Sequence, residues 1–239
     1  MNKAIIKNKI QVNGFISITA SFEGDVITNK DLGGYVKWVD SISETKRTVS
    51  ISKVDETDST MTLDFVDHGR EGKMATWARD CKIGDEFQFM GPGPAANISL
   101  NGDDYYFLGD RTAFPAIRVQ LERLLQSQSK ANLYIGLEGS KEEIQHYFSK
   151  YISLPNTHLL SMNESDDQMV FVNLFEEFFN DTSSEKILWC AAERNKVLPM
   201  RKLVKEIQSE LVDKYISSYW QNGLKDEEHK KNKKLDSAI

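Results

Sequence analysis

The chain has 239 residues, of which 40% are hydrophobic, with a formal net charge of −6 and an isoelectric point near 5.4. This composition supports one or two ordinary domains with a sizeable core. The acidic balance argues against a general nucleic-acid binder, which would carry a basic stripe over much of one face. There is no apolar stretch of about 18 residues, and the opening residues MNKAIIKNKI are too polar for a signal peptide, so we expect a cytoplasmic protein without a membrane partner.

Short segments rich in β-branched and aromatic residues follow one another up to about residue 100. They read KIQVNGFISITASF, GGYVKWVD, RTVSISKV, STMTLDFVDHG and DEFQFMG, and turn signals such as Gly33-Gly34 and Gly84-Asp85 separate them. Residues 61–65, MTLDF, alternate between apolar and polar, as in a strand with one buried face. The pattern predicts a small antiparallel β-barrel or sandwich.

The pattern changes after Gly102. Short apolar runs, YYFLG, ANLYIGL, QMVFVNL and KILWCA, alternate with helical patterns such as PAIRVQLERLL and KEEIQHYFSKYI. Strands that alternate with helices predict a mostly parallel sheet with helices on its faces. The Gly/Pro/Asn-rich residues 91–104 mark the joint, so we expect a barrel domain at 1–102 and an α/β domain at 103–239. The charged tail KDEEHKKNKKLDSAI predicts a solvated or frayed helix.

An acid and a hydroxyl stand at the end of the first apolar run of the second half. Gly109-Asp110-Arg111-Thr112 follows YYFL directly, and Pro115 then begins a helical pattern. In open parallel sheets ligands bind at the carboxyl ends of the strands, which makes this stretch a candidate site. An ordinary helix cap formed by Asp110 or Thr112 explains the same residues.

Several kinds of chemistry lack a pattern in the sequence. Cys81 and Cys190 are far apart and have no histidine or second cysteine at metal spacing, so we expect two reduced thiols and no metal site. There is no Ser-His-Asp or Cys-His arrangement, and we nominate no catalytic acid, base or nucleophile. The GxGxxG fingerprint of dinucleotide-binding proteins is absent, so the residues do not distinguish NADH from NADPH.

Six stretches between about residue 33 and residue 229 form an ordered set of motifs. They are GYVK (34–37), RTVS (47–50) followed by LDFVDHG (63–69), GKMATWA (72–78) with the glycines that follow it, GDRTAFPAI (109–117), AAE (191–193) with Arg201, and YWQNG (219–223). In this order they resemble the siderophore-interacting proteins, cytosolic flavin reductases built like ferredoxin reductases. Each stretch is weak alone, but the common order is specific.

The chain also departs from the pattern of that family. Val49 stands where the family has a tyrosine, Ser52 where it has a second arginine, and Ala75 where it has a serine. Arg111 stands where the family has a glutamate, and Ala192 and Ser218 each stand where it has a glycine. These changes weaken the expected stacking on flavin, the phosphate contacts and the turn on the nucleotide side.

The resemblance implies a fold and a set of cofactor-binding positions. The fold is β followed by α/β: an N-terminal antiparallel barrel that binds FAD and a Rossmann-like domain that binds NADH or NADPH and ends in a siderophore-interacting segment. The residues expected to contact FAD or the nicotinamide nucleotide are Arg47, Val49, Ser50, Ile51, His68, Gly69, Thr76, Trp77, Gly109, Asp110, Thr112, Ala191 and Glu193.

The resemblance also implies the reaction. A hydride would pass from NAD(P)H to flavin, and electrons would then pass singly to ferric iron in a bound siderophore. Reduction frees the metal because ferric iron prefers hard oxygen donors more strongly than ferrous iron does. An anionic chelate needs local positive charge. The residues expected to contact it are Lys37, Arg111, Arg118, Arg194, Arg201 and Trp220.

Three interpretations remain open. The chain is an NAD(P)H-dependent ferric-siderophore reductase, a siderophore- or partner-binding module of the same fold that has weakened or lost flavin binding, or a flavin reductase with another acceptor. In each case we expect a monomer. For each nominated side chain, a structural role such as core packing or a solvated surface charge is the competing explanation.

Overall fold

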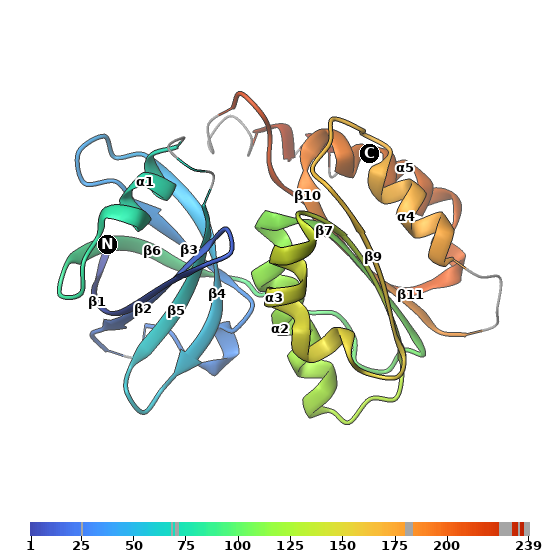
Figure 1. Ribbon diagram of the computed structural model, residues 1–239, viewed down its shortest axis with the longest axis horizontal. Coiled ribbons are helices and arrows are strands. Elements are labelled where there is room, and N and C mark those ends of the chain that lie inside the picture. The colour runs from blue at the N-terminus through green and yellow to red at the C-terminus, as the bar shows by residue number, and fades with distance from the viewer. Residues whose placement is uncertain are drawn as a thin grey trace. The chain divides into compact units, whose positions relative to one another are not determined.

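The computed structural model describes residues 1–24, 26–67, 69, 72–179, 184–224, 231–233 and 235–236. They form two compact units, Met1–Ala96 and Asn97–Ile239 (Figure 1). The first unit is a closed antiparallel barrel and the second is a parallel sheet with helices, so the predicted fold class is confirmed. In the part of the chain that is described, no helix combines the length and the hydropathy needed to cross a bilayer.

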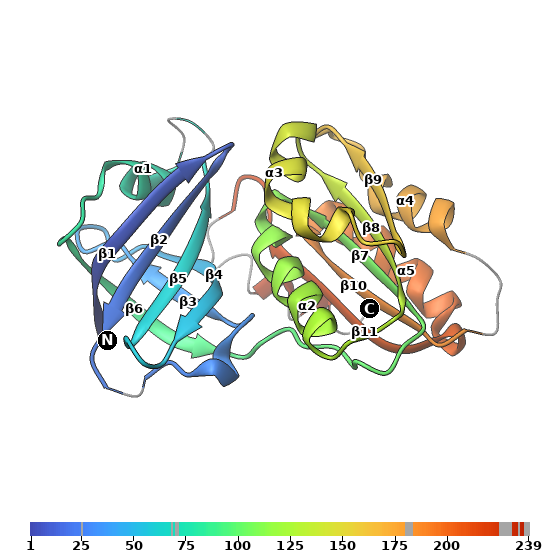
Figure 2. The ribbon, with the colours of Figure 1, turned by 60° about the horizontal axis from the view of Figure 1, so that its bottom comes forward.

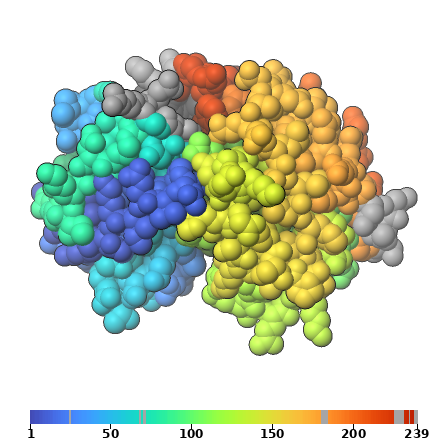
Figure 3. Space-filling view, in the orientation of Figure 1, coloured from blue at the N-terminus to red at the C-terminus, as the bar shows by residue number. Residues whose placement is uncertain are grey.

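Six strands close the barrel in the order β1-β2-β5-β4-β3-β6, and every neighbouring pair is antiparallel. Closure leaves no edge strand that could pair with another chain. Figure 3 shows β1 and β2 in blue and the region of α1 in green on the surface of this unit. The elements of the unit are β1 (Asn2–Val12), β2 (Phe15–Phe22), η1 (Asn29–Asp31), β3 (Tyr35–Val39), β4 (Lys46–Asp55), β5 (Thr60–Val66), α1 (Lys73–Asp80) and β6 (Glu86–Gly93).

The barrel interior is apolar because alternate residues of each strand point inward. Every second residue of β5 from Met61 to Phe65 is fully buried, as the alternation predicted. Trp77 packs from α1 against this core, with its ring centroid 5.2 Å from Trp38, 5.7 Å from Phe65 and 5.2 Å from Phe87. The connection between β5 and β6 is therefore held by a cluster of four aromatic rings.

The second unit contains a five-stranded sheet in the order β11-β10-β7-β8-β9, and all four pairings are parallel. Helices α2 and α3 cover one face and α4 and α5 the other (Figure 2). The elements are β7 (Asp104–Asp110), η2 (Arg111–Ala113), α2 (Phe114–Gln126), β8 (Asn132–Glu138), α3 (Lys141–Ile152), β9 (Thr157–Met162), α4 (Val170–Phe178), β10 (Lys186–Glu193), α5 (Arg194–Glu206), η3 (Gln208–Glu210) and β11 (Leu211–Trp220).

The central strands set the position of the candidate site. Every residue of β7 and of β10 is buried, which is why these segments read as continuous apolar runs rather than as alternating ones. Because the strands are parallel, their carboxyl ends lie at one edge of the sheet. That edge carries the last residues of the five strands, which are Asp110, Glu138, Met162, Glu193 and Trp220.

Two elements of the second unit differ from the sequence expectation. The run QMVFVNL was expected to be a strand, but α4 begins inside it at Val170, and Val170, Phe171, Leu174 and Phe175 form its buried face. A short apolar run does not by itself distinguish a buried strand from a buried helix. The fifth strand is β9, which pairs only with β8 within the sheet and has no fully buried residue, so it lacks a strong apolar signal.

Trp77→Ala should lower the free energy of unfolding of the barrel by about 2 to 4 kcal/mol, because it removes the ring that contacts three other aromatic side chains. Urea unfolding followed by hydrogen exchange of barrel peptides measures the change. The matched control is Ile42→Ala, since Ile42 is 92% exposed and its truncation should change stability by less than about 0.5 kcal/mol. Equal effects of the two changes would contradict a core role for Trp77.

Candidate functional site

A buried carboxylate at the end of β7 joins three strands. Asp110 is 6% exposed, and its Oδ1 accepts hydrogen bonds from the Thr112 backbone N–H at 2.9 Å and from the Thr112 hydroxyl at 2.5 Å. Its Oδ2 accepts from the Glu193 backbone N–H at 2.8 Å and from Trp220 Nε1 at 2.9 Å. The expected cap is thus confirmed, and the same side chain also ties the ends of β10 and β11 to β7.

Gly109 allows this edge to pack closely. A Cβ at this position would lie 2.7 Å from the Ala113 Cβ, 2.9 Å from the Ile117 Cδ1 and 3.1 Å from the Ala191 carbonyl oxygen. The start of α2 and the end of β10 therefore approach the backbone of β7 more closely than any side chain permits. The glycine serves close approach in this place.

The buried groups around Asp110 have shifted pKa values. Burial raises the pKa of Asp110, and the hydrogen bonds from Thr112, Trp220 and Glu193 oppose that rise. Burial, and next the charge of Asp110, raise the pKa of the Cys190 thiol, which lies one strand away on β10. Cys190 and Cys81 are both free and buried, so Cys190 is an unreactive, protonated thiol at neutral pH.

Two further carboxylates stand at the same edge. Glu193, the last residue of β10, caps α5 by accepting from the Asn195 N–H at 2.5 Å, and it also accepts from the Asn222 N–H at 3.2 Å. Glu138, the last residue of β8, is fully buried and pairs with Lys196 Nζ at 2.6 and 2.7 Å. Each of these strand ends therefore carries an acid whose oxygens are used by nearby donors.

Two of the cations expected to contact a chelate, Arg111 and Arg118, have contacts inside the second unit. Arg111 pairs with Glu143 of α3 at 2.7 Å and with Glu164 at 3.4 Å. The Arg118 guanidinium lies 4.5 Å from the ring centroid of Tyr147. The structure thus gives Arg111 and Arg118 contacts that also fit a purely structural role.

The remaining residues of that expected set have partners too. Arg194 forms a two-pronged pair with Asp236 at 2.6 and 2.7 Å, and Arg201 donates to the carbonyl oxygen of Ile216 at 2.8 Å. Trp220 is 40% exposed although its Nε1 donates to Asp110. Lys37 lies on β3 of the barrel and is half-buried.

Arg111 holds together the start of α3 and the segment after β9. Its side chain is 12% exposed, and Glu143, one of its two partners, is also the N3 residue of the capping box that begins with Ser140. The family glutamate at this position would meet two carboxylates instead of pairing with them. The chain thus has an arginine where the family has a glutamate, and Glu143 and Glu164 of the same unit pair with it.

The flavin-motif residues of β4 divide between core and surface. Val49 and Ile51 are 5% and 0% exposed and belong to the barrel core. Arg47 and Ser50 are half-buried, and they pair across the ladder with Trp38 and Tyr35 of β3. Val49 fills the barrel interior and offers no ring face to a ligand.

Among the described residues, no side chain caps the start of α1. Its N-cap is Gly72, which has a φ of +85° and no side chain to cap the helix, and its first turn contains no acidic residue. Thr76, in the second turn, accepts from Arg79 at 3.1 Å, and Arg79 also binds Asp67 at 2.6 Å. Backbone N–H groups at a helix N-terminus, without a side-chain cap, form a ready site for phosphate.

Three flavin-site nominees remain, Gly69, Trp77 and His68. Gly69 is exposed, and its N–H donates to Asp67 Oδ1 at 3.0 Å. Trp77 packs against the core as described above, which fits the structural alternative for this residue. His68 lies outside the described residues.

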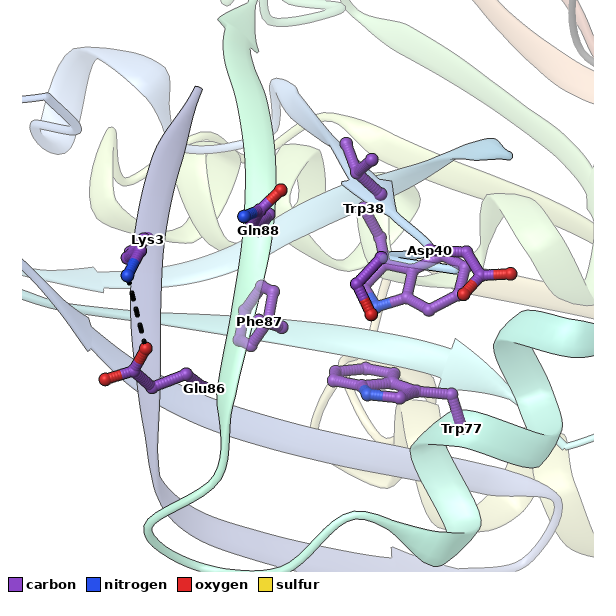
Figure 4. A pocket seen from close by; sticks show the side chains of 9 residues that line it. Lys3, Trp38, Asp40, Trp77, Glu86, Phe87 and Gln88 are labelled. Atoms are coloured by element: carbon purple, nitrogen blue, oxygen red, sulfur yellow. Dashed lines mark ion pairs between the residues drawn. The ribbon is translucent and has the colours of Figure 1, made fainter. Parts of the chain in front are cut away.

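A pocket of about 190 Å³ opens on the barrel beside Trp77 (Figure 4). Trp38, Trp77 and Phe87 form its aromatic wall, and Lys3 and Glu86 stand at its rim 3.6 Å apart. Its rim carries Glu86 and also Asp40, the partner of Lys73 at 3.6 Å. With these acids at its mouth, the pocket is poorly suited to a phosphate.

Comparison with known proteins identifies the family. Residues 21–96 match the siderophore-interacting FAD-binding domain, and residues 102–223 match the siderophore-interacting protein family. The chain belongs to the siderophore-interacting protein family. The resemblance inferred from the motifs is thereby confirmed, and the flavin-binding match lies within the barrel unit and ends with it at residue 96.

A curated relative has a named activity. The chain is 26% identical over 169 residues to the ferric vibriobactin reductase ViuB of Vibrio cholerae, an alignment that covers 69% of this chain and 60% of that protein. The chain thus spans about three fifths of the length of the relative. The match supports an oxidoreductase in general.

Solved structures agree in fold. The siderophore-interacting protein of Acinetobacter baumannii has a TM-score of 0.79 at 17% identity, covering 99% of this chain and 97% of that one. SipS of Aeromonas hydrophila has a TM-score of 0.76 at 21% identity, covering 99% and 98%. The ferredoxin-NADP⁺ reductase of Plasmodium falciparum has a TM-score of 0.63 at 15% identity, covering 91% and 96%. These likenesses show a ferredoxin-reductase-like fold.

Sequence reasoning missed two ion pairs at the carboxyl edge. Lys196–Glu138 joins the first turn of α5 to β8, and Arg194–Asp236 joins the same turn to a tail that was expected to be solvated. That expectation is wrong at Asp236, which is 1% exposed. One signal was available: three apolar runs, YYFLGD, NLYIGLE and ILWCAAE, each end on an acid.

Asp110→Ala should lower the free energy of unfolding of the second unit by about 3 to 5 kcal/mol, because two backbone N–H groups, a hydroxyl and an indole N–H lose their acceptor. Urea unfolding monitored by hydrogen exchange of β7 and β10 peptides measures this. Asp166→Ala is the control, since Asp166 is exposed and should change stability by less than about 0.5 kcal/mol. A loss no larger than in the control would remove the linking role of Asp110.

Arg111 and Glu143 should be energetically coupled by about 1 to 3 kcal/mol, because both side chains are largely shielded and 2.7 Å apart. A double-mutant cycle with Arg111→Gln and Glu143→Gln measures the coupling. The exposed pair Lys150–Glu122 is the comparison, and its coupling should be below about 1 kcal/mol. A coupling near zero for Arg111 and Glu143 would leave Arg111 available for another ligand.

Proposed function

We propose that the chain is an FAD-dependent ferric-siderophore reductase that takes its electrons from NADH or NADPH. The observation that carries the proposal is the match of both units, in order, to the flavin-binding domain and the siderophore-interacting protein. The relative named as a ferric vibriobactin reductase points the same way. In this proposal the ferric chelate is the substrate and the chain itself ligates no metal.

In this proposal FAD is bound by Arg47 and by backbone N–H groups of the barrel unit. The uncapped first turn of α1, starting at Gly72, offers backbone N–H groups to a pyrophosphate. Arg47 offers a guanidinium fork that suits phosphate oxygens, and Ser50 offers a hydroxyl from a paired strand. Flavin bound there would supply the conversion of a two-electron hydride into single electrons.

The second unit supports a nicotinamide nucleotide at the carboxyl edge of its sheet. Gly109 lets Ala113, Ile117 and Ala191 pack against the backbone of β7, so the start of α2 and the end of β10 are held close together at the surface where, in this proposal, the nucleotide binds. Asp110 holds Thr112, Glu193 and Trp220 in fixed positions around that surface. In this role Asp110 orients its neighbours by accepting their hydrogen bonds.

A second candidate function is a binding module of the same fold with weakened flavin binding. Val49 is part of the barrel core and cannot stack on a flavin. Ser52 is buried and donates to the carbonyl oxygen of Thr62 at 3.1 Å, and Ala75 is 4% exposed. These positions offer neither a ring nor a charge to the cofactor.

The third part of the proposal concerns the electron acceptor, which is the ferric chelate. Arg111 and Arg194 are paired with carboxylates, so a chelate that used either one would first have to replace an acid. This favours a modest contribution of these cations to chelate binding over a preformed basic pocket. A flavin reductase that serves another acceptor is the corresponding alternative.

Two measurements separate these functions. The full-length protein is purified, examined for the yellow absorption of oxidised flavin, and reconstituted with FAD if it is colourless. NADH or NADPH is then added, and ferric-siderophore loss is followed with a ferrous trap. A protein that cannot take up FAD favours the binding module, and reduction of free flavin without reduction of chelates favours the other acceptor.

Arg47→Ala should weaken FAD binding about tenfold to a hundredfold without unfolding the barrel, because it removes charged hydrogen bonds to phosphate. Fluorescence titration with FAD measures the affinity, and thermal unfolding checks the fold. Arg47→Lys keeps the charge but loses the fork, so it should fall between the parent and the alanine variant. Unchanged flavin affinity in Arg47→Ala would remove Arg47 from the site.

A further inference from the structure

A segment near the C-terminus closes on the carboxyl edge of the parallel sheet through one arginine. Arg194 is the first residue of α5, and its Nε and Nη2 donate to the two oxygens of Asp236 at 2.7 and 2.6 Å. The Asp236 side chain is 2% exposed, whereas that of Arg194 is 20% exposed.

The same segment makes a second contact at this edge. Asn232 donates from its amide to Gln221 Oε1 at 3.0 Å, directly after the end of β11. Residues 231–233 and 235–236, which we call the tail segment, are therefore attached both to the strand end and to the start of α5. Gln221 and Arg194 serve as its two anchoring points.

The tail segment also makes an unfavourable contact. Burial, and next the charge of Arg201, lower the pKa of Lys233. Seating the segment thus brings a partly desolvated cation close to another cation. The attachment through Asp236 has to offset this cost, so the closed arrangement is less stable than its ion pair alone suggests.

The chemistry of the pair indicates what else Arg194 can bind. A guanidinium presents two parallel N–H groups that match the oxygens of a carboxylate or of a phosphate. The backbone N–H groups of Asn195 and Asn222 are less available to an anion, because both already donate to the Glu193 carboxylate. The group at the start of α5 that can bind an anion is therefore the Arg194 guanidinium.

We propose that Arg194 is a binding residue for the diphosphate of a nucleotide, and that Asp236 occupies it as an internal competitor. A diphosphate binds after the Asp236 carboxylate leaves Arg194. This inference rests on the proposed function in that it takes the ligand of the second unit to be a pyridine nucleotide. The tail segment then regulates access to the same edge that carries Gly109 and Asp110.

The energetic consequence is a reduced apparent affinity in the parent protein. If Arg194 is available only in the fraction of molecules in which the tail segment is released, the apparent dissociation constant rises by the inverse of that fraction. Weakening the Asp236 contact removes this reduction, and weakening Arg194 removes the binding group itself. The two changes therefore have opposite effects on anion affinity.

The test measures binding of inorganic pyrophosphate and of NADPH to the full-length protein by calorimetry. Asp236→Asn, which is nearly isosteric, should bind both ligands about fivefold or more tightly than the parent. Arg194→Gln combined with Asp236→Asn should lose that gain. Pyrophosphate bound elsewhere in the protein contributes equally to all variants, so the differences report on this contact. Glu122→Gln, which breaks the exposed Lys150–Glu122 pair, is the control and should bind as the parent does.

A charge exchange keeps the test informative if single changes loosen the fold. Arg194→Asp combined with Asp236→Arg should restore hydrogen-exchange protection of the tail segment while leaving anion binding weak. Unchanged or weaker anion binding in Asp236→Asn, with the fold intact by thermal unfolding, would overturn the inference. Tighter pyrophosphate binding without NADPH binding or reductase activity would instead overturn the proposed function and leave the anion site in place.

Discussion

The hydrogen bonds to Asp110 are the interaction on which the second unit depends. A carboxylate buried at the end of a central strand is costly unless its oxygens are used, and four donors, two from Thr112 and one each from the ends of β10 and β11, use them. One side chain thus links the ends of β7, β10 and β11 at the carboxyl edge. Everything proposed for the nucleotide side requires this edge to be rigid, and Gly109 contributes by letting α2 and β10 pack closely against β7.

The barrel follows a different logic. Its fold rests on apolar alternation and ring packing, and the positions that the family uses for flavin are partly absorbed into that packing. Val49 and Trp77 stabilise the barrel, whereas Arg47 and the N-terminus of α1 remain suited to an anion. The first unit therefore keeps the barrel architecture, while Val49 and Trp77 serve its core.

Charge balance connects the site to its proposed ligands. The carboxyl edge of the sheet carries Asp110, Glu138 and Glu193, and the arginines and lysine near it are used by acids of the same chain. An anionic ligand at this edge must compete with internal carboxylates instead of entering an empty basic pocket. Such competition gives affinity that depends on how firmly an internal acid is held, and the Asp236 pair is the place where the acid belongs to a separate segment.

The sequence by itself determined an antiparallel β first half, a parallel α/β second half and, through its ordered motifs, the family, because strand alternation, buried apolar runs and turn residues are local properties of the chain. It also indicated Asp110 as a cap, since a cap uses residues two positions apart. Only the tertiary structure decided that QMVFVNL is largely helical, that Asp110 accepts from Trp220, and that Arg194 meets Asp236. These contacts join residues that are 110 and 42 positions apart in the chain, and a pairing over such distances is set by packing, which no local pattern of residues encodes.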